Sequence, residues 1–97
     1  MWARVASFEG GDTERLRQLN EEAMASGTMD TPPGIKRVLV LASGDGSKRL
    51  FVSFFDDREA LTAAEPAFDR MGDDIPEDVR GRRTAVDVYE VVFDGQL

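Results

Sequence analysis

One amide in this sequence occupies a position where an apolar side chain is expected. Asn20 falls between Leu16 and Met24 at the spacing of an amphipathic helix, so it lies on the apolar stripe of that helix. An amide there can orient a carbonyl or phenol oxygen of a ligand held between the helix and a sheet. The simpler interpretation, which we favour, is an amide at the edge of the stripe that bonds to backbone or water.

A second candidate is an arginine within the first predicted strand. Arg4 points to the same side of that strand as Trp2 and Phe8, among apolar neighbours. A guanidinium in such a place requires a carboxylate partner or an anionic group of a ligand. We favour a structural ion pair, with Asp87 or Glu90 of the last strand as the partner, over a ligand contact.

Large apolar side chains could complete a site around these polar groups. Met24, Phe54 and Phe68, together with Met71, would form a soft aromatic wall for a flat apolar ligand. The same side chains suit a packed core, which is the interpretation we favour. The candidate ligand site therefore comprises Arg4, Asn20, Met24, Phe54 and Phe68, and no catalytic residue is identified.

Histidine and cysteine are both absent from the chain. Their absence removes Ser-His-Asp and Cys-His triads, His-ligated haem and thiolate zinc sites. The carboxylates of Asp73, Asp74, Glu77 and Asp78 match the spacing of no calcium loop, so we expect a solvated acidic loop there. We expect neither a metal site nor a bound cofactor.

The charge balance limits the classes of partner. The 97 residues include 12 basic and 19 acidic side chains, which give a formal net charge of -7. Such a chain repels phosphate backbones and anionic lipids, so we expect no nucleic acid and no membrane partner. Residues 1–9 resemble a strand rather than a signal peptide, and no apolar run is long enough to span a bilayer. The cytoplasm is the expected location.

The segments that must position these side chains follow the order strand, helix, strand, strand, helix, strand. Strands are predicted over residues 2–9, 35–42, 48–55 and 84–93, with a hairpin connection over residues 43–47. No linker divides the chain, so residues 1–97 form one domain. The order favours an α+β, ferredoxin-like βαββαβ fold, with a four-stranded antiparallel sheet and both helices on one face.

The helix boundaries follow from capping residues and prolines. Asp12 caps the first helix, which closes before Gly27. Asp56, with Glu59 three residues later, has the spacing of a capping box for the second helix. Pro66 should kink that helix or split it, and an acidic connector with room for one short helical turn follows over residues 72–82.

The strands are apolar on both faces, which is unusual for a sheet with helices on one side. In the second strand Ile35, Leu39 and Leu41 point one way, while Val38 and Val40 point the other. A bare apolar face of several hundred Å² is more than soluble monomers tolerate. The simplest cover is a second copy related by a two-fold axis, so we expect a homodimer.

Four groups of residues, in register with these elements, carry a family resemblance. They are Ala3-Arg4-Val5 with Phe8-Glu9-Gly10, Pro33-Gly34-Ile35, the run FFDDREAL from Phe54 to Leu61, and Val88-Tyr89-Glu90-Val91-Val92. Through them nearly the whole chain resembles the antibiotic biosynthesis monooxygenase-like family of dimeric α/β-barrel proteins. The resemblance implies a homodimer whose two sheets form a barrel.

Two hypotheses about function remain open and are given equal weight. Members of the family that the chain resembles include cofactor-free quinone-forming monooxygenases and haem-degrading enzymes. The haem-degrading members use a histidine that this chain lacks, and Phe55 stands where the family often has tryptophan. The first hypothesis is therefore a cofactor-independent monooxygenase acting on an aromatic or polycyclic small molecule. The alternative is a non-catalytic dimer that binds a small molecule or a protein partner.

Overall fold

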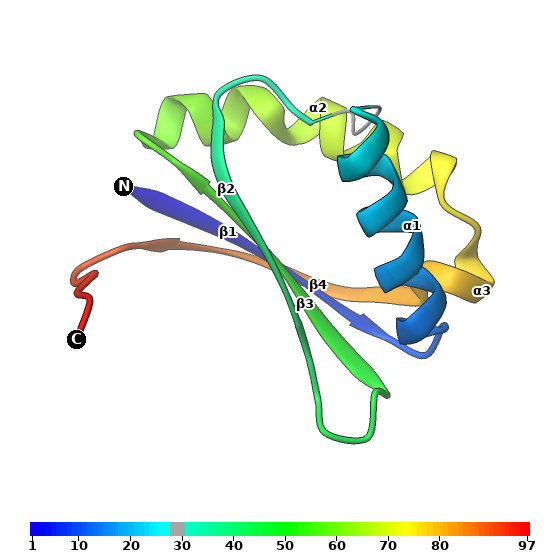
Figure 1. Ribbon diagram of the computed structural model, residues 1–97. Coiled ribbons are helices and arrows are strands. Elements are labelled where there is room, and N and C mark those ends of the chain that lie inside the picture. Colours follow the sequence, from blue (N-terminus) through cyan, green and yellow to red (C-terminus); the bar gives the residue numbers. More distant parts are fainter. Residues whose placement is uncertain (28–30) are drawn as a thin grey trace.

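The chain folds into one sheet with helices packed on one of its faces (Figure 1). The computed structural model describes residues 1–27 and 31–97, except for the side chains of residues 71–74. The elements are β1 (Trp2–Glu9), α1 (Thr13–Ser26), β2 (Ile35–Ala42), β3 (Lys48–Phe55), α2 (Arg58–Asp74), α3 (Glu77–Arg80) and β4 (Arg82–Glu90). No described helix is both long and apolar enough to cross a bilayer.

All strand pairs in the sheet are antiparallel, and the strand order is β2-β3-β1-β4. β1 and β3 are central, whereas β2 and β4 form the two edges. This order and the element sequence are those of the ferredoxin-like α+β fold, so the expected fold class is confirmed. The short α3 occupies the connector in which a single helical turn was expected.

The core lies between α2 and the two central strands. Phe55 is fully buried and packs with Leu61 and Ala64 of α2, and Trp2, Ile35, Ala60 and Phe68 surround this cluster. Directly paired residues share a face of the sheet, so Trp2 and its partner Phe55 assign one face to the helices. We call this the helix face, and it includes Arg4, Ala6 and Arg49.

The second helix differs from the expectation in two ways. It runs without a break from Arg58 to Asp74, with Pro66 inside it, so the predicted split is wrong. Pro66 is exposed, and packing on both sides of it, through Ala64 and Phe68, holds the helix against the sheet. The capping residue is Asp57 rather than Asp56, because the Asp57 carboxylate accepts a 2.8 Å hydrogen bond from the backbone N–H of Ala60.

The last strand is shifted toward the N-terminus relative to its prediction. β4 ends at Glu90, and Val92 and Phe93 lie beyond it with 89% and 84% of their surface exposed. The backbone N–H of Val91 still donates to the carbonyl of Met1, and after that residue the chain leaves the sheet (Figure 1). The last paired residues of the two strands are Trp2 and Glu90.

A register irregularity changes one face assignment in β2. The pairing of β2 with β3 shifts between Ile35 and Arg37, so Ile35 lies on the helix face beside Phe55. Ile35 was expected to share a face with Leu39 and Leu41, and that assignment is wrong because the irregularity inserts an extra residue. The face opposite the helices, which we call the open face, carries Val5, Leu39, Leu41, Leu50, Val52, Phe54 and Tyr89.

Candidate functional site

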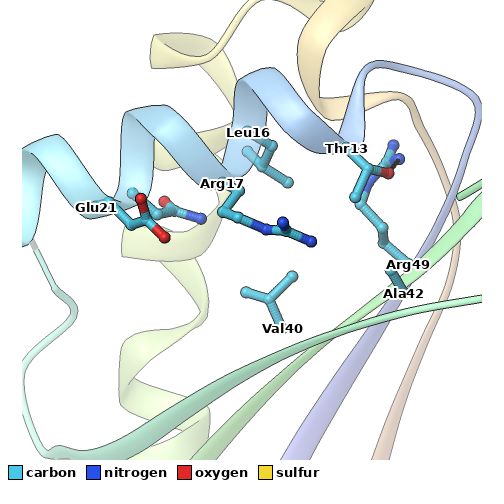
Figure 2. A pocket seen from close by; sticks show the side chains of 8 residues that line it. Thr13, Leu16, Arg17, Glu21, Val40, Ala42 and Arg49 are labelled. Carbon is cyan, nitrogen blue, oxygen red and sulfur yellow. Dashed lines mark hydrogen bonds between the residues drawn. The ribbon is translucent and has the colours of Figure 1, made fainter.

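A pocket of about 230 Å³ lies between α1 and the β2–β3 side of the helix face (Figure 2). We call it the α1 pocket. α1 supplies side chains from successive turns, because residues three and four apart face the same way along a helix. The sheet supplies the opposite wall from an edge strand and a central strand. The lining residues are Thr13, Leu16, Arg17, Asn20, Glu21, Val40, Ala42 and Arg49.

Arg49 forms one end of the pocket and is 1% exposed. Its Nη1 atom donates to the hydroxyl of Thr13 at 2.7 Å, and its Nη2 atom donates to the backbone carbonyls of Gly10 and, at 2.9 Å, Arg80. Its Nε atom is buried and has no hydrogen-bond partner among the described residues. Arg49 therefore ties the start of α1 and the end of α3 to the sheet through neutral acceptors alone.

Two glycines make room for this guanidinium. A Cβ atom on Gly81 would lie 2.6 Å from the Arg49 Nη2 atom, and one on Gly11 would lie 2.7 Å from it. Both glycines have φ angles of +80°, which other residues rarely adopt. The chain turns tightly at both positions so that backbone carbonyls can reach the buried cation.

Arg17 and Glu21 place opposite charges at the pocket. The side chain of Arg17 extends between Leu16 and Val40, with its guanidinium toward the Arg49 end, whereas Glu21 lies at the other end (Figure 2). Among the described residues, Arg17 is held by a single 3.4 Å contact with Glu14, in which both side chains are at least 60% exposed. Its guanidinium is therefore free to turn toward a bound molecule.

Solved structures share this architecture over almost the entire chain. They include a point mutant of MhuD with two manganese protoporphyrin IX molecules bound per active site, with a TM-score of 0.65, 16% identity and 99% of each chain covered. The structure of Rv0793 from Mycobacterium tuberculosis aligns with a TM-score of 0.61 and 18% identity, covering 98% of each chain. A monooxygenase from the gene ActVA-Orf6 of Streptomyces coelicolor, in complex with nanaomycin D, aligns with a TM-score of 0.59 and 16% identity over 99% of this chain and 89% of the other.

This chain has the fold of those proteins. The fold that the sequence resemblance implied is thus confirmed by independent structures. No protein-family profile matches the sequence, and no curated protein matches it. The likeness is therefore one of architecture, and the site has to be interpreted from this chain's own residues.

The sequence-predicted site residues are divided among four places. Asn20 is partly buried and lines the α1 pocket, on the stripe that its spacing predicted. Met24, one turn further along α1, is 69% exposed and lies outside the pocket lining. Phe68 lies under α2, where its ring packs edge-on against Phe55 with centroids 6.2 Å apart.

Phe54 lies on the open face, away from both helices. It pairs with Ala3 on β1, and the guanidinium of Arg37 lies 5.9 Å from the centre of its ring. Phe54 and Phe68 therefore cannot form one wall, because the sheet separates them. The expected contribution of Met71 lies outside the described residues.

Arg4 is buried beneath α2 with 3% of its surface exposed. Its Nε atom donates to Glu65 Oε1 at 2.7 Å, and its guanidinium carbon lies 4.1 Å from the centre of the Phe68 ring. An ion pair was expected, but its assignment to Asp87 or Glu90 is wrong. Asp87 pairs with Val5, so it points to the open face, and the helix rather than the last strand supplies the carboxylate.

Sequence reasoning missed most of the polar pocket lining. Arg49 was open to detection, because its spacing from Phe51 and Phe55 on β3 places a guanidinium on the same strand face as these apolar side chains. Arg17 and Glu21 gave no such signal, since charged residues on a surface helix are ordinary.

Within the described part of the chain, no group of three or more acidic side chains has the geometry to hold a metal ion. Of the four carboxylates that form a cluster in the sequence, Asp73 and Asp74 lie outside the described side chains. Glu77 and Asp78 are exposed in the first turn of α3.

Proposed function

We propose that this protein is a cofactor-independent monooxygenase that oxidises a small aromatic molecule in the α1 pocket. The observation that carries the proposal is the lining of that pocket, where an amide, a guanidinium and a carboxylate accompany apolar side chains. Two proteins of the same fold hold flat ring systems, nanaomycin D in a monooxygenase and protoporphyrin in the active site of MhuD. Family membership is part of the same proposal.

The chemistry needs one base and one anion-stabilising group. Glu21 would accept the proton of an activated C–H group, while Asn20 and Arg17 donate hydrogen bonds to the oxyanion that develops on the ring. The resulting carbanion reduces dioxygen, and a C–O bond forms to give a hydroperoxide. Loss of water leaves a carbonyl, so a CH2 group and O2 become a C=O group and H2O. No redox cofactor enters this balance.

Aerobic incubation with anthrone, followed by an oxygen electrode, tests the proposal. We expect oxygen uptake above that of heat-treated protein, and we expect Glu21→Gln to lower the rate by about a hundredfold. Glu22→Gln is the matched control, because Glu22 is the exposed neighbour on α1 and does not line the pocket. Uptake that equals the heat-treated control would remove the enzymatic proposal.

A non-catalytic binding protein is the second candidate. The observation that favours it is the position of Arg4, a residue of the candidate ligand site, which is engaged by Glu65 away from the α1 pocket. A pocket with a single carboxylate as its base suits binding as well as turnover. Saturable binding of an aromatic ligand without oxygen uptake would support this candidate.

We further propose that two copies pair through their open faces, in the cytoplasm. Three of the apolar side chains there are well exposed, with values of 48% for Leu41, 37% for Leu50 and 55% for Tyr89. The face also carries opposite charges near its two edges, Arg37 on β2 and Asp87 on β4. A two-fold axis parallel to the strands would bring β2 of one copy opposite β4 of the other, and these charges together.

A further inference from the structure

The α1 pocket combines a buried cation with an exposed one. Arg49 is 1% exposed, and no carboxylate within the described part of the chain forms an ion pair with it. Its partners are a hydroxyl and backbone carbonyls, so its full positive charge acts on its surroundings. A buried charge without a counter-ion is costly, and an anion placed nearby relieves that cost.

A guanidinium offers five N–H donors, and in Arg49 the Nη atoms are already engaged. Arg49 therefore acts on a bound ligand through its electrostatic field more than through direct hydrogen bonds. The direct donors available to a ligand are the guanidinium of Arg17, which lies across the pocket (Figure 2), and the amide of Asn20, which is also among the lining residues. Glu21 is the one acidic side chain among the described lining residues, so these residues carry a net charge of about +1 within a chain of net charge -7.

The apolar lining of the α1 pocket and its volume limit the chemistry and the size of the rest of the ligand. Leu16 on the α1 wall and Val40 and Ala42 on the sheet wall provide apolar surfaces that suit an aromatic ring. A cavity of about 150 Å³ holds one benzene molecule. The α1 pocket, at about 230 Å³, can enclose a naphthalene-sized part of a ring system, so the third ring of a molecule such as anthrone would lie outside the enclosed volume, and a porphyrin cannot be enclosed.

We propose that the α1 pocket selects a small aromatic oxyanion, such as an aryl carboxylate, that Arg17 and Asn20 bind in the field of Arg49. This inference names the ligand class of the pocket used in the proposed function and rests on that function for its biological meaning. Binding itself does not require turnover, so the inference about the ligand class and the proposed function can be overturned separately.

Calorimetric titration of the whole protein with 2-naphthoate and with the neutral 2-naphthamide tests the inference. We expect naphthoate to bind at least about tenfold more tightly than naphthamide, because a hydrogen bond to a charged group adds that much affinity. Arg17→Gln should remove this preference. Arg15→Gln is the matched control, since Arg15 is an exposed arginine of the same helix outside the pocket lining.

A variant of Glu21 should change the affinity for naphthoate in the opposite direction. Glu21→Gln should tighten naphthoate binding several-fold, because it removes the negative charge that faces the anion, while the same change lowers turnover in the oxygen assay. Equal binding of naphthoate and naphthamide, equal losses in Arg17→Gln and Arg15→Gln, or no binding of either compound would overturn the inference. Oxygen uptake with anthrone alongside any of these results would leave the proposed function standing.

Discussion

Arg4 in the central strand β1 and Glu65 in α2 are joined by a 2.7 Å hydrogen bond from Nε to Oε1, 61 residues apart in the sequence. The Arg4 side chain is 4% exposed, whereas that of Glu65 is 37% exposed, so water screens one partner only. The Arg4 Nη2 atom is also buried without a partner among the described residues. Glu65 is thus the counter-ion on which this buried cation depends.

Replacement of Glu65 by Gln should lower the free energy of unfolding by about 1–2 kcal/mol. Breaking a buried pair costs more than this, but the partial exposure of Glu65 reduces the loss. Urea unfolding followed by circular dichroism measures it. The control is Asp69→Asn on the same helix, whose 3.6 Å contact with Arg83 is exposed and should change stability by less than about 0.5 kcal/mol. Equal effects of the two changes would contradict the structural role of Glu65.

Replacement of Gly81 by Ala should destabilise the protein by at least about 2 kcal/mol. The added Cβ would clash with Arg49 and with the backbone carbonyl of Glu9, and a φ of +80° strains any residue with a side chain. Thermal unfolding should show a midpoint lower by roughly 10 °C. Gly44→Ala is the control, because a Cβ atom at that position would have no other atom within 4 Å and the φ of Gly44 is not in the left-handed region. Similar midpoints for the two variants would contradict the close approach of Gly81 to Arg49.

Asn20 and Arg4 should respond differently to mutation. Asn20→Ala should weaken ligand binding or turnover by about tenfold and leave the unfolding midpoint nearly unchanged, since the amide lines an open pocket. Arg4→Met should change stability and leave ligand affinity nearly unchanged, because Arg4 lies outside the pocket lining. Gln18→Ala, on the exposed side of α1, serves as the control for Asn20. An unfolding midpoint that drops in Asn20→Ala would indicate that the amide is structural.

Reversal of the charges on the open face tests the proposed dimer. Light scattering at micromolar concentration should give the mass of two copies for the natural sequence. Arg37→Asp or Asp87→Arg alone should shift the protein toward monomer, because like charges then face each other across the two-fold axis. The double variant should recover the dimer. A monomer mass for the unaltered protein would dismiss the pairing altogether.

Asp45 in the β2–β3 hairpin gives a prediction for acid solution. Its Oδ1 atom accepts from the hydroxyl of Ser43 and from the backbone N–H and hydroxyl of Ser47. The bonds from Ser47 and Ser43 lower the pKa of Asp45 from 3.8 to about 2. A lowered pKa stabilises the fold above about pH 4, and that contribution disappears as the pH falls toward 2.

Carboxyl NMR titration should therefore find the Asp45 midpoint near 2. The free energy of unfolding of the natural protein should exceed that of Asp45→Asn at pH 4, and the difference should shrink as the pH falls to 2. This interval runs from about the ordinary pKa of Asp45 to its lowered pKa. A midpoint at the ordinary aspartate value would show that these hydrogen bonds do not persist in solution.

The fold could be predicted from the sequence because each strand and helix has clear end signals. Asp12 caps α1 as expected, its carboxylate accepting from the backbone N–H of Arg15 at 3.0 Å. The face that meets the helices could not be predicted, because both faces of the sheet are apolar. Only the register places Phe55 on one side and Phe54 on the other.

The site was less accessible to prediction than the fold. Asn20 could be found because one polar residue interrupts an apolar stripe. The partner of Arg4 could not be predicted, because the position of Glu65 depends on how far α2 extends over the sheet and on the continuation of this helix through Pro66. The pocket itself arises from the spacing between α1 and β2, a tertiary property that no local pattern encodes.

The two walls of the α1 pocket differ in how freely they can change. Val40 and Ala42 belong to β2, an edge strand, and both are exposed, so larger or smaller side chains there would alter the pocket at little cost to stability. Arg49 belongs to a central strand and is fixed by several segments at once. Mutational drift can therefore change the shape of the pocket while the buried charge of Arg49 is retained. Related chains should diverge at the positions of Val40 and Ala42 long before they diverge at the position of Arg49.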